Sequence, residues 1–506
     1  MELPESIRDI KSIPNRKGKV MAAKNVLAFD LGASSGRGML ARFDGKKITL
    51  EEVHRFPHNF SILNGHAYWN ILLLIDEMKK GMRLCREELS GVGFDTWGVD
   101  CGLIDREGNM LALPGSYRDA ALDDANMAEA LEKIGGEEYA FAQTGIASLA
   151  YNTLYKLYYM QKNMPSIMES ADKMLLMPNL IEYLFSGAVH TEYSIASTTQ
   201  LYDMREKRWA KSLIQKIGLP DKLFTSVDLA GRDLGPLRRE VAKEVGQEQL
   251  HIISAPGHDT ACAVAAVPAR DGEFTFLSSG TWSLMGISSK KLLEGESIIR
   301  DKISNEGTAD GGYRPTVNII GLWINQELRR NFAAQGKNYS FVEMTNLAGK
   351  EKPLQSFIDP DDFMQPGDYP TKIREYCKNT GQKNPETDGA LVRCVLESLA
   401  LKYRQVYDTL RMFVTWEEKL YIVGGGSQNE LLNQFTANAL GIPVITGASE
   451  ATAVGNVMSQ LKALGAYHTR EEKCEILAAS FGTEEFLPEE QDAWQEAYER
   501  FKGLGH

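Results

Sequence analysis

Long hydrophobic runs and C-x-x-C cysteine pairs are missing from this sequence. No stretch reaches the roughly 18 uninterrupted apolar residues that a membrane-spanning helix needs. Six cysteines are spread through 506 residues, which favours small core residues in a reducing compartment over a metal site or a disulfide framework. Two of them, Cys377 and Cys394, could pair in principle. The six are Cys85, Cys101, Cys262, Cys377, Cys394 and Cys474.

The sequence also has no excess of positive charge. The chain has 56 basic and 68 acidic side chains, a formal net charge of −12. This balance argues against nucleic acid as the main partner, because binding to a phosphate backbone needs a concentrated basic surface. Residues 1–24 carry many charges and no apolar core, so we expect a solvated N-terminal extension and no secretory signal. The protein is then expected to be cytoplasmic.

Several enzyme motifs are absent as well. There is no G-x-x-x-x-G-K-[ST], so a P-loop kinase is excluded at the level of motifs. The lysine and H-R-D motifs of protein kinases are missing, and so is H-E-x-x-H. The run Gly32–Gly36 matches the G-x-S-x-G hydrolase elbow by letter. That elbow leads from a strand into a helix, whereas this turn leads into a second strand, so we interpret the match as chance.

The composition that remains is that of a globular protein, with 43% hydrophobic and 25% charged residues. A strand over 25–32, a small polar turn and a second strand over 38–43 predict a hairpin. The same element recurs over 274–287, and strands alternate with helical patterns along the chain, which predicts α/β domains with partly parallel sheets. We predict the following division: 1–24 extension, 25–267 N-terminal domain, 268–272 hinge, 273–485 C-terminal domain and 486–506 helical tail.

The first hairpin turn carries the pattern Asp30-x-Gly32-x-x-x-Gly36. Small residues in such a turn expose backbone N–H groups that can hold a phosphate chain. An aspartate beside phosphates makes sense if Mg²⁺ lies between them, since this ion binds carboxylate and phosphate oxygens, often through waters. The second turn, Ser278–Trp282, has the same character. The alternative for either turn is a plain hairpin with a polar tip.

Two further motifs can carry chemistry. Gly424–Gly426 follows a strand and lets a flat ring or sugar approach the main chain, although a turn without a ligand is the alternative. In Gly257–Thr260 the carboxylate of Asp259 begins a helix among small apolar residues and is a candidate general base. The alternative for Asp259 is a helix N-cap. His258 is expected to be its hydrogen-bonding neighbour, because no His or Cys partner stands at ligand spacing.

The segment Asp95–Asp100 combines two acids with Trp97, as sugar pockets often do, although a plain strand end is an equal alternative. Asn318 and Gln326 flank Gly321-Leu-Trp323 and are amides suited to hydroxyl or ribose contacts. Taken alone, they are merely polar residues beside a helix.

Together and in this order, four motifs resemble those of the FGGY carbohydrate kinases, which have the actin-like ATPase fold. They are DLGASSGR at 30–37, GHDT at 257–260, SGT at 279–281 and VGGGS at 423–427. The resemblance covers residues 25 to about 465. It implies an α/β, two-domain actin-like ATPase (ribonuclease H-like) fold, with a nucleotide and substrate cleft between the domains. The segments 94–100, 276–286 and 321–326 are most similar to the branch that acts on L-rhamnulose.

The resemblance also implies roles for matching residues. Asp259 would be the catalytic base that takes the proton from the ketose 1-hydroxyl, and Asp30 would orient Mg²⁺ through waters. The sugar would be bound by Gly98, His258, Asp259, Thr260 and Asn318. ATP would be bound by Ala33, Ser34, Ser35, Gly36, Arg37, Thr281, Gln326, Gly424, Gly425 and Gly426. Many family members have threonine in place of Ala33, which leaves the phosphate contacts to backbone groups and to Ser34 and Ser35.

The implied activity is ATP-dependent phosphorylation of L-rhamnulose at the 1-hydroxyl in L-rhamnose catabolism. Its partners would be a small sugar and MgATP, with no nucleic acid and no membrane, in a monomer or small homo-oligomer. Two alternatives stay open. The substrate could be another ketose or deoxy sugar, such as L-fuculose or xylulose, or the chain could be a non-catalytic actin-like nucleotide-binding protein.

Overall fold

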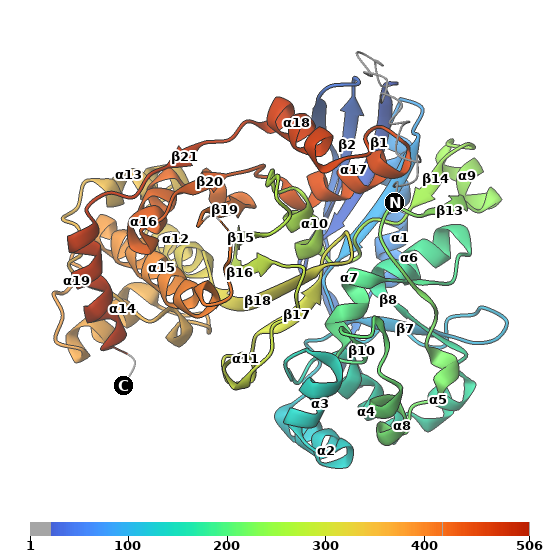
Figure 1. Ribbon diagram of the computed structural model, residues 1–506. Helices are drawn as coiled ribbons and strands as arrows, with labels where there is room; N and C mark the ends of the chain where they lie inside the picture. Colours follow the sequence, from blue (N-terminus) through green and yellow to red (C-terminus); the bar gives the residue numbers. More distant parts are fainter. Residues whose placement is uncertain (1–21, 417, 505–506) are drawn as a thin grey trace, which may run out of the picture.

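The computed structural model describes residues 22–416 and 418–504, so most of the expected N-terminal extension lies outside the described residues. Two sheets, one from each half of the chain, form the centres of two lobes (Figure 1). The first sheet has the order β13 (Asp233–Pro236), β14 (His251–Ile253), β6 (Gly91–Thr96), β1 (Lys24–Leu31), β2 (Ser35–Phe43) and β3 (Ile48–Pro57). The second has the order β17 (Ser304–Gly307), β18 (Tyr313–Ile320), β16 (Trp282–Ser288), β15 (Phe274–Ser279), β19 (Leu420–Val423), β20 (Val444–Thr446) and β21 (Glu485–Phe486).

Each sheet is built around one of the two predicted hairpins. Strands β1 and β2 are antiparallel, and β1 also runs parallel to β6, which places Asp30 opposite Asp95. In the second sheet β15 and β16 are antiparallel, and β15 runs parallel to β19, which places Ser278 opposite Val423. The predicted repetition of the strand–turn–strand element is therefore confirmed. Parallel pairing brings motifs that are distant in sequence to the same edge of each sheet.

Two helices lie against each other between the sheets, α10 (Asp259–Ala265) and α17 (Ala451–Ala463) (Figure 1). Helix α17 also packs against β1 and β6, although it comes late in the chain, while α10 contacts β15. The two backbones touch at Gly455, where an added methyl group would overlap the carbonyl oxygen of Cys262. A shared core joins these helices to both sheets through Val26, Ala28, Val264, Phe276, Val423, Val454 and Val457.

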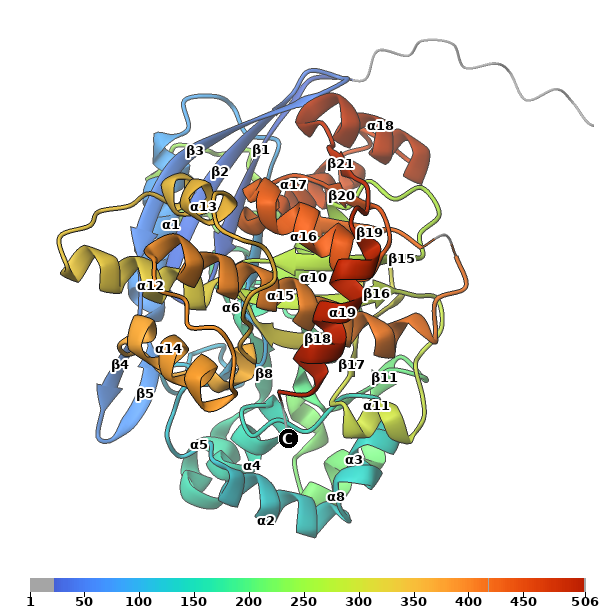
Figure 2. The ribbon, with the colours of Figure 1, turned by 90° about the vertical axis from the view of Figure 1, so that its left-hand side faces the viewer.

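Helices surround both sheets (Figure 2). In the first lobe they are α1 (Ile71–Leu84), α2 (Asp124–Ile134), α3 (Glu137–Thr144), α4 (Thr153–Asn163), α5 (Pro165–Ser170), α6 (Met177–Ser186), α8 (Lys211–Ile217) and α9 (Arg239–Val245). The pattern over 69–89 predicts a longer helix than α1. The helix ends at Leu84 because Cys85 has extended backbone angles.

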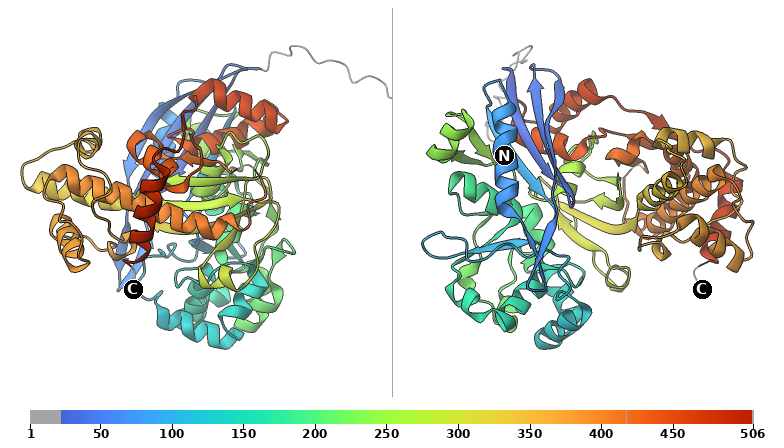
Figure 3. Two further views of the ribbon diagram at one scale, coloured as in Figure 1. Left: turned by 60° about the vertical axis from the view of Figure 1, so that its left-hand side comes forward. Right: turned by 180° about the vertical axis from the view of Figure 1, so that it is seen from behind.

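The second lobe carries a cluster of helices on one side of its sheet (Figure 3). Its long helix α15 has apolar residues at helical spacing from Leu391 to Leu410 and is buried along most of its length. The helices of this half are α11 (Glu296–Arg300), α12 (Trp323–Ala334), α13 (Phe341–Gly349), α14 (Tyr369–Asn379), α15 (Asp388–Arg411), α16 (Glu430–Leu440), α18 (Arg470–Phe481) and α19 (Gln491–Lys502).

Short elements complete the fold. The segment formed by α7 (Tyr193–Ala196) and the 3-10 turn η1 (Ser197–Thr199) contacts β17 of the second sheet. Further 3-10 turns are η2 (Asp221–Leu223), η3 (Pro360–Asp362) and η4 (Gly425–Gln428), and the remaining strands are β4 (Phe60–Leu63), β5 (His66–Trp69), β7 (Cys101–Ile104), β8 (Lys173–Leu176), β9 (Thr191–Glu192), β10 (Tyr202–Asp203), β11 (Arg208–Trp209) and β12 (Val227–Asp228). All six cysteines are buried and free, as small core residues would be. Across 22–416 and 418–504 no helix is long and apolar enough to cross a membrane.

Candidate active site

The turn of the first hairpin exposes small residues beside a buried acid. The N–H of Gly32 donates to the carbonyl of Ser35 at 3.0 Å, which closes the turn. Arg37 lies between two carboxylates: its Nη2 is 2.7 Å from Oδ2 of Asp30, and its Nη1 forms an ion pair with Glu450 at the start of α17. Burial raises the pKa of Asp30, and the charge of Arg37 opposes that shift.

A second acid, Asp95, lies at the end of the neighbouring strand. Its Oδ2 accepts a hydrogen bond from Asn456 at 2.7 Å, while its Oδ1 is buried without a partner among the described residues. Burial, and then the nearby charge of Asp30, raise the pKa of Asp95 well above its usual range; the charge of Asp259 adds to the shift. The unpartnered oxygen of Asp95, with Asp30 nearby, suits a cation bound partly through waters. Within the described ranges, however, no group of three or more His, Cys, Asp or Glu is arranged to hold a metal ion.

The second hairpin turn brings together residues predicted to bind nucleotide. Gln326, in α12, donates from Nε2 to Oγ1 of Thr281 at 2.9 Å. Gly424 has a φ of +87°, and a Cβ added there would come within 2.8 Å of the carbonyl oxygen of Ser279. Only glycine adopts this conformation readily and allows this approach. Gly425, by contrast, faces open space, with no atom within 4 Å of an added Cβ.

The two turns are connected through one short loop. The N–H of Gly424 donates to the carbonyl of Ala448 at 3.4 Å, and two residues later Glu450 pairs with Arg37 of the first hairpin. The structure therefore links Ala33–Arg37, Thr281, Gln326 and Gly424–Gly426 through this loop.

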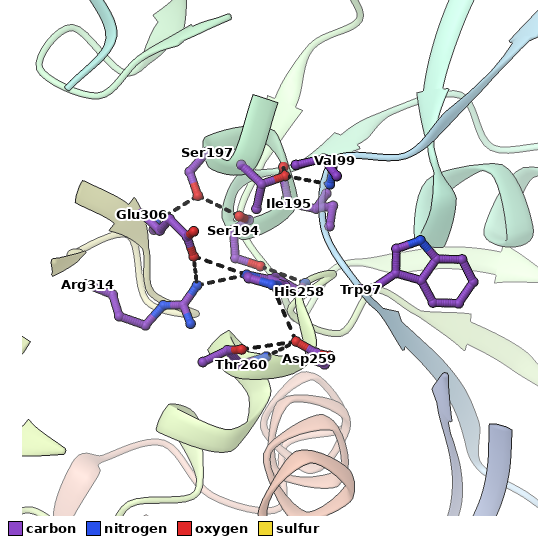
Figure 4. A network of polar contacts seen from close by, with 12 residues as sticks. Trp97, Val99, Ser194, Ile195, Ser197, His258, Asp259, Thr260, Glu306 and Arg314 are labelled. Carbon is purple, nitrogen blue, oxygen red and sulfur yellow. Dashed lines mark hydrogen bonds and ion pairs between the residues drawn. The ribbon is translucent and has the colours of Figure 1, made fainter. Parts of the chain in front are cut away.

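The candidate base lies at the start of α10 (Figure 4). Oδ1 of Asp259 accepts from the N–H of Thr260 at 2.5 Å and from its hydroxyl at 3.1 Å, and Nε2 of His258 is 3.3 Å away. Oδ2 makes no hydrogen bond to any residue that the structure describes, and the side chain is 30% exposed. The N-cap position belongs to His258, so the alternative that Asp259 is the N-cap is wrong.

Glu306 and Arg314, which both lie in the second sheet, contact His258 (Figure 4). No motif in the sequence identified either residue. The guanidinium of Arg314 is fully buried; its Nη2 lies 2.9 Å from Nδ1 of His258 and forms an ion pair with Glu306. The two residues are paired across β17 and β18. Burial acts to raise the pKa of Glu306, but the charges of Arg314 and His258 outweigh it and lower that pKa to about 2.

This shift predicts acid sensitivity. The pKa of Glu306 falls from 4.5 to about 2 on folding, so the unfolded chain binds more protons between these values. Its contribution, on the order of 3 kcal/mol, is then present above pH 4.5 and is lost as the pH falls toward 2. Urea unfolding of the Glu306→Gln variant should show a shallower loss of stability over this range than the unaltered chain. Equal slopes would contradict the prediction.

Gly98 occupies a tight turn after β6. Its carbonyl accepts from the N–H of Asp100 at 2.8 Å, with Val99 held at a φ of +64°, a strained value for a β-branched residue. The N–H of Val99 donates to Oγ1 of Thr198 at 3.0 Å. The segment that holds this turn also bears Ser194, whose hydroxyl accepts from the N–H of His258 at 3.3 Å. One segment thus positions Gly98 and His258.

Asp100 does not face a ligand, which corrects the idea that both acids of the Asp95–Asp100 segment line a sugar pocket. It is 1% exposed and forms an ion pair with Lys156. Its Oδ2 also accepts from the indole nitrogens of Trp69 at 2.5 Å and Trp97 at 2.8 Å. Trp97 is itself buried, so the alternative of a structural strand end fits this part of the segment.

Asn318 is exposed on β18. It stands four residues after Arg314, and since side chains alternate along a strand, both belong to the same face. No contact of its side chain links it to His258 or Asp259 among the described residues. Its predicted contact with a substrate stays a prediction.

Known proteins are similar to this chain over nearly its whole length. A rhamnulokinase from Bacteroides thetaiotaomicron is 40% identical over 485 residues, covering 95% of this chain and 99% of the relative. A rhamnulokinase from Ligilactobacillus salivarius is 36% identical over 474 residues, covering 92% and 96%.

Solved structures of sugar kinases have the same fold. A xylulose kinase from Rhodospirillum rubrum superimposes with a TM-score of 0.77 at 17% identity, covering 95% of this chain and 98% of that one. A gluconate kinase from Lactobacillus acidophilus gives 0.76 at 14% identity, covering 96% and 98%. These likenesses confirm the predicted actin-like, two-lobed α/β fold. The models of the N-terminal and C-terminal domains of one family match residues 25–266 and 275–464, and the chain therefore belongs to the FGGY family of carbohydrate kinases.

Proposed function

We propose that this sugar kinase transfers the γ-phosphoryl group of ATP to the 1-hydroxyl of L-rhamnulose, a step of L-rhamnose catabolism. The choice of L-rhamnulose as the substrate is supported by the similarity to rhamnulokinases, which are 35–40% identical over about nine-tenths of the chain or more. We further propose that residues 25–267 carry the sugar site and residues 273–485 most of the nucleotide site. The segment 268–272 then links the two domains.

Asp259 is proposed as the general base. As the sugar oxygen attacks the γ-phosphorus, the proton of that hydroxyl passes to Oδ2, and the bond from the γ-phosphorus to the bridging oxygen of ADP breaks. The N–H and the hydroxyl of Thr260 both donate to Oδ1, which leaves Oδ2 available to the substrate. His258 steadies the carboxylate from 3.3 Å. The sugar is held by Gly98, His258, Thr260 and Asn318.

ATP is proposed to lie against both hairpin turns. Backbone and hydroxyl groups of Ala33–Gly36 hold phosphate oxygens, and Arg37 adds charge once it turns from Glu450. Thr281 and Gln326 act as a hydrogen-bonded pair, while Gly424–Gly426 allow the nucleotide to approach the main chain. Asp30, through waters, and the unpartnered oxygen of Asp95 fit Mg²⁺, which when bound supplies charge neutralisation at the phosphates.

A panel of sugars tests the substrate. With MgATP fixed, release of ADP is measured for L-rhamnulose, L-fuculose and D- and L-xylulose. We expect kcat/KM to be at least about tenfold higher for L-rhamnulose, because a site built for its hydroxyls leaves polar groups unpaired with another ketose. A higher kcat/KM for another sugar would contradict the proposal that L-rhamnulose is the substrate. Light scattering with ATP, combined with no sugar-stimulated turnover, would favour an actin-like binding protein.

A further inference from the structure

A pocket lies near the C-terminal ends of α10 and α17, whereas Asp259 and Glu450 lie at the N-terminal ends of these helices. Its volume is about 130 Å³. Helix α10 contributes Val264 and Ala265 from its last turn, and α17 contributes Met458, Ser459 and Lys462. We call this the distal pocket. None of the residues that line it belongs to the candidate active site described above.

The distal pocket is lined from both lobes. Ala230 and Gly231 come from the loop that precedes β13 of the first sheet, whereas Phe274 and Ser288 belong to β15 and β16 of the second. The wall is completed by the loop 308–310, by residues 467–469 before α18, and by Arg470 and Lys473 in its first turn. A change in the angle between the lobes therefore alters the shape of this pocket.

Positive charge in this wall exceeds negative charge. Lys462, Arg470 and Lys473 line the pocket with a single carboxylate, Asp310, which leaves a net charge of +2. Arg470 pairs with Asp310, Nη2 to Oδ2, at 2.7 Å. Neither lysine forms an ion pair with any residue in the part of the chain that the structure describes. Glu472, the neighbouring acid on α18, is engaged in the capping box of that helix.

The environment of Lys473 adds a second argument. Burial, and then repulsion by the Arg470 guanidinium, lower the pKa of the Lys473 ammonium to about 8. An anion in the pocket would offset this lowering of the pKa, because it supplies the charge that the wall lacks. Phosphate suits these donors, since guanidinium forks bind its oxygens and lysine acts as a compact charge beside them.

We propose that the distal pocket binds a small dianion bearing a phosphoryl group, and that this binding regulates the kinase by favouring one arrangement of the lobes. The volume is below the range of about 300–1,000 Å³ typical of pockets for larger ligands, so a nucleotide is too large. Because both lobes form the wall, the anion binds the two arrangements with different affinity, and by reciprocity it changes the affinity for sugar or ATP.

Binding is tested with inorganic phosphate and with glycerol 3-phosphate as probes. A non-hydrolysable ATP analogue is kept at saturation, so that the phosphate subsites of the active site are occupied. In calorimetry and thermal unfolding we expect both probes to bind the unaltered chain and raise its Tm. Sodium chloride at matched ionic strength should not reproduce the effect. A response to chloride equal to that for phosphate would reject the site.

Charge-removing variants locate the site. Lys462→Gln and Lys473→Gln should each weaken phosphate binding about tenfold, as expected for loss of one charge-assisted contact. Lys462 is exposed, so its replacement keeps the test valid even if Lys473→Gln does not fold. Lys502→Gln, an exposed position on α19, is the matched control. Unchanged affinity in Lys462→Gln and in any folded Lys473→Gln would overturn the proposal.

Regulation is tested by activity. Phosphate should change the KM for sugar or ATP in the unaltered chain, and Lys462→Gln should lose this response while keeping its basal kcat. Phosphate binding without any change in either KM would overturn the regulatory part. The binding measurement does not depend on which sugar is the substrate, so failure of the proposed function and failure of the distal site are distinguishable.

Discussion

Replacement of Asp259 by asparagine is expected to lower kcat for the sugar by about 10²–10⁴-fold, the range that a positioned general base contributes. The physical reason is the loss of proton acceptance at Oδ2, which makes no hydrogen bond to a described residue and belongs to a side chain that is 30% exposed. The amide oxygen of asparagine can still accept from the N–H and hydroxyl of Thr260, so the start of α10 is preserved. A coupled assay of sugar-dependent ADP formation measures the effect.

The other parameters should change little in the Asp259→Asn variant. The KM for ATP should stay within a few-fold of its original value, and the Tm within a few degrees, because only the charge near the first turn of a helix is lost, worth about 0.3–1 kcal/mol. Asp492→Asn, in the first turn of α19, is the matched control for such a charge change and should leave kcat unaltered. Retention of most of the sugar-dependent turnover would remove Asp259 from the mechanism.

The local parts of the site could be predicted from the sequence. Turn chemistry between short apolar runs identified both hairpins, and the turn at Gly424–Gly426 lies at a strand end as expected. The partnership of Asp30 with Asp95 could not be predicted in the same way. It depends on the register of the parallel strands β1 and β6, which are separated by four other strands and α1 in the chain.

Glu306 and Arg314 show a second limit. In the sequence each is the single charged residue of its strand, and such residues are mostly exposed to solvent. In the fold they are covered because the α7–η1 segment of the first half packs on β17, where Ser197 accepts from the N–H of Gly307 at 2.8 Å. Burial of this kind depends on contacts between distant segments, so periodicity alone does not reveal it.

Helix α17 limits any division of the chain by sequence order. Residues 451–463 lie between β20 and β21 of the second sheet along the chain, yet they pack on the first sheet. Gln460 of this helix donates to the carbonyl of Leu27 at 3.0 Å, and Asn456 donates to Asp95 at 2.7 Å. The C-terminal part of the chain therefore completes the core around the N-terminal acids. This link offers a physical route by which the distal pocket, at the far end of α17, reaches the site at its start.

Replacement of Lys156 by methionine is expected to lower the free energy of unfolding by about 3–5 kcal/mol, because it leaves the carboxylate of Asp100 buried without its cation. Lys156 is 4% exposed and Asp100 is 1% exposed. Lys156 also donates to the carbonyl of Gly115 at 3.0 Å, a contact that methionine cannot replace. Chemical denaturation of the purified variant measures the change.

Lys162→Met on the same helix is the matched control, since Lys162 pairs with Glu129 at the surface, where such pairs contribute only about 0–1 kcal/mol. The double variant Lys156→Met/Asp100→Asn should regain part of the stability, because it removes the unpaired charge but keeps an acceptor for the indoles of Trp69 and Trp97. A cost for Lys156→Met no larger than that for Lys162→Met would contradict the account. Because the N–H of Asp100 donates to the carbonyl of Gly98 at 2.8 Å, the KM for the sugar should also rise in Lys156→Met and not in Lys162→Met. That second readout separates loss of the Gly98 turn from a general loss of stability.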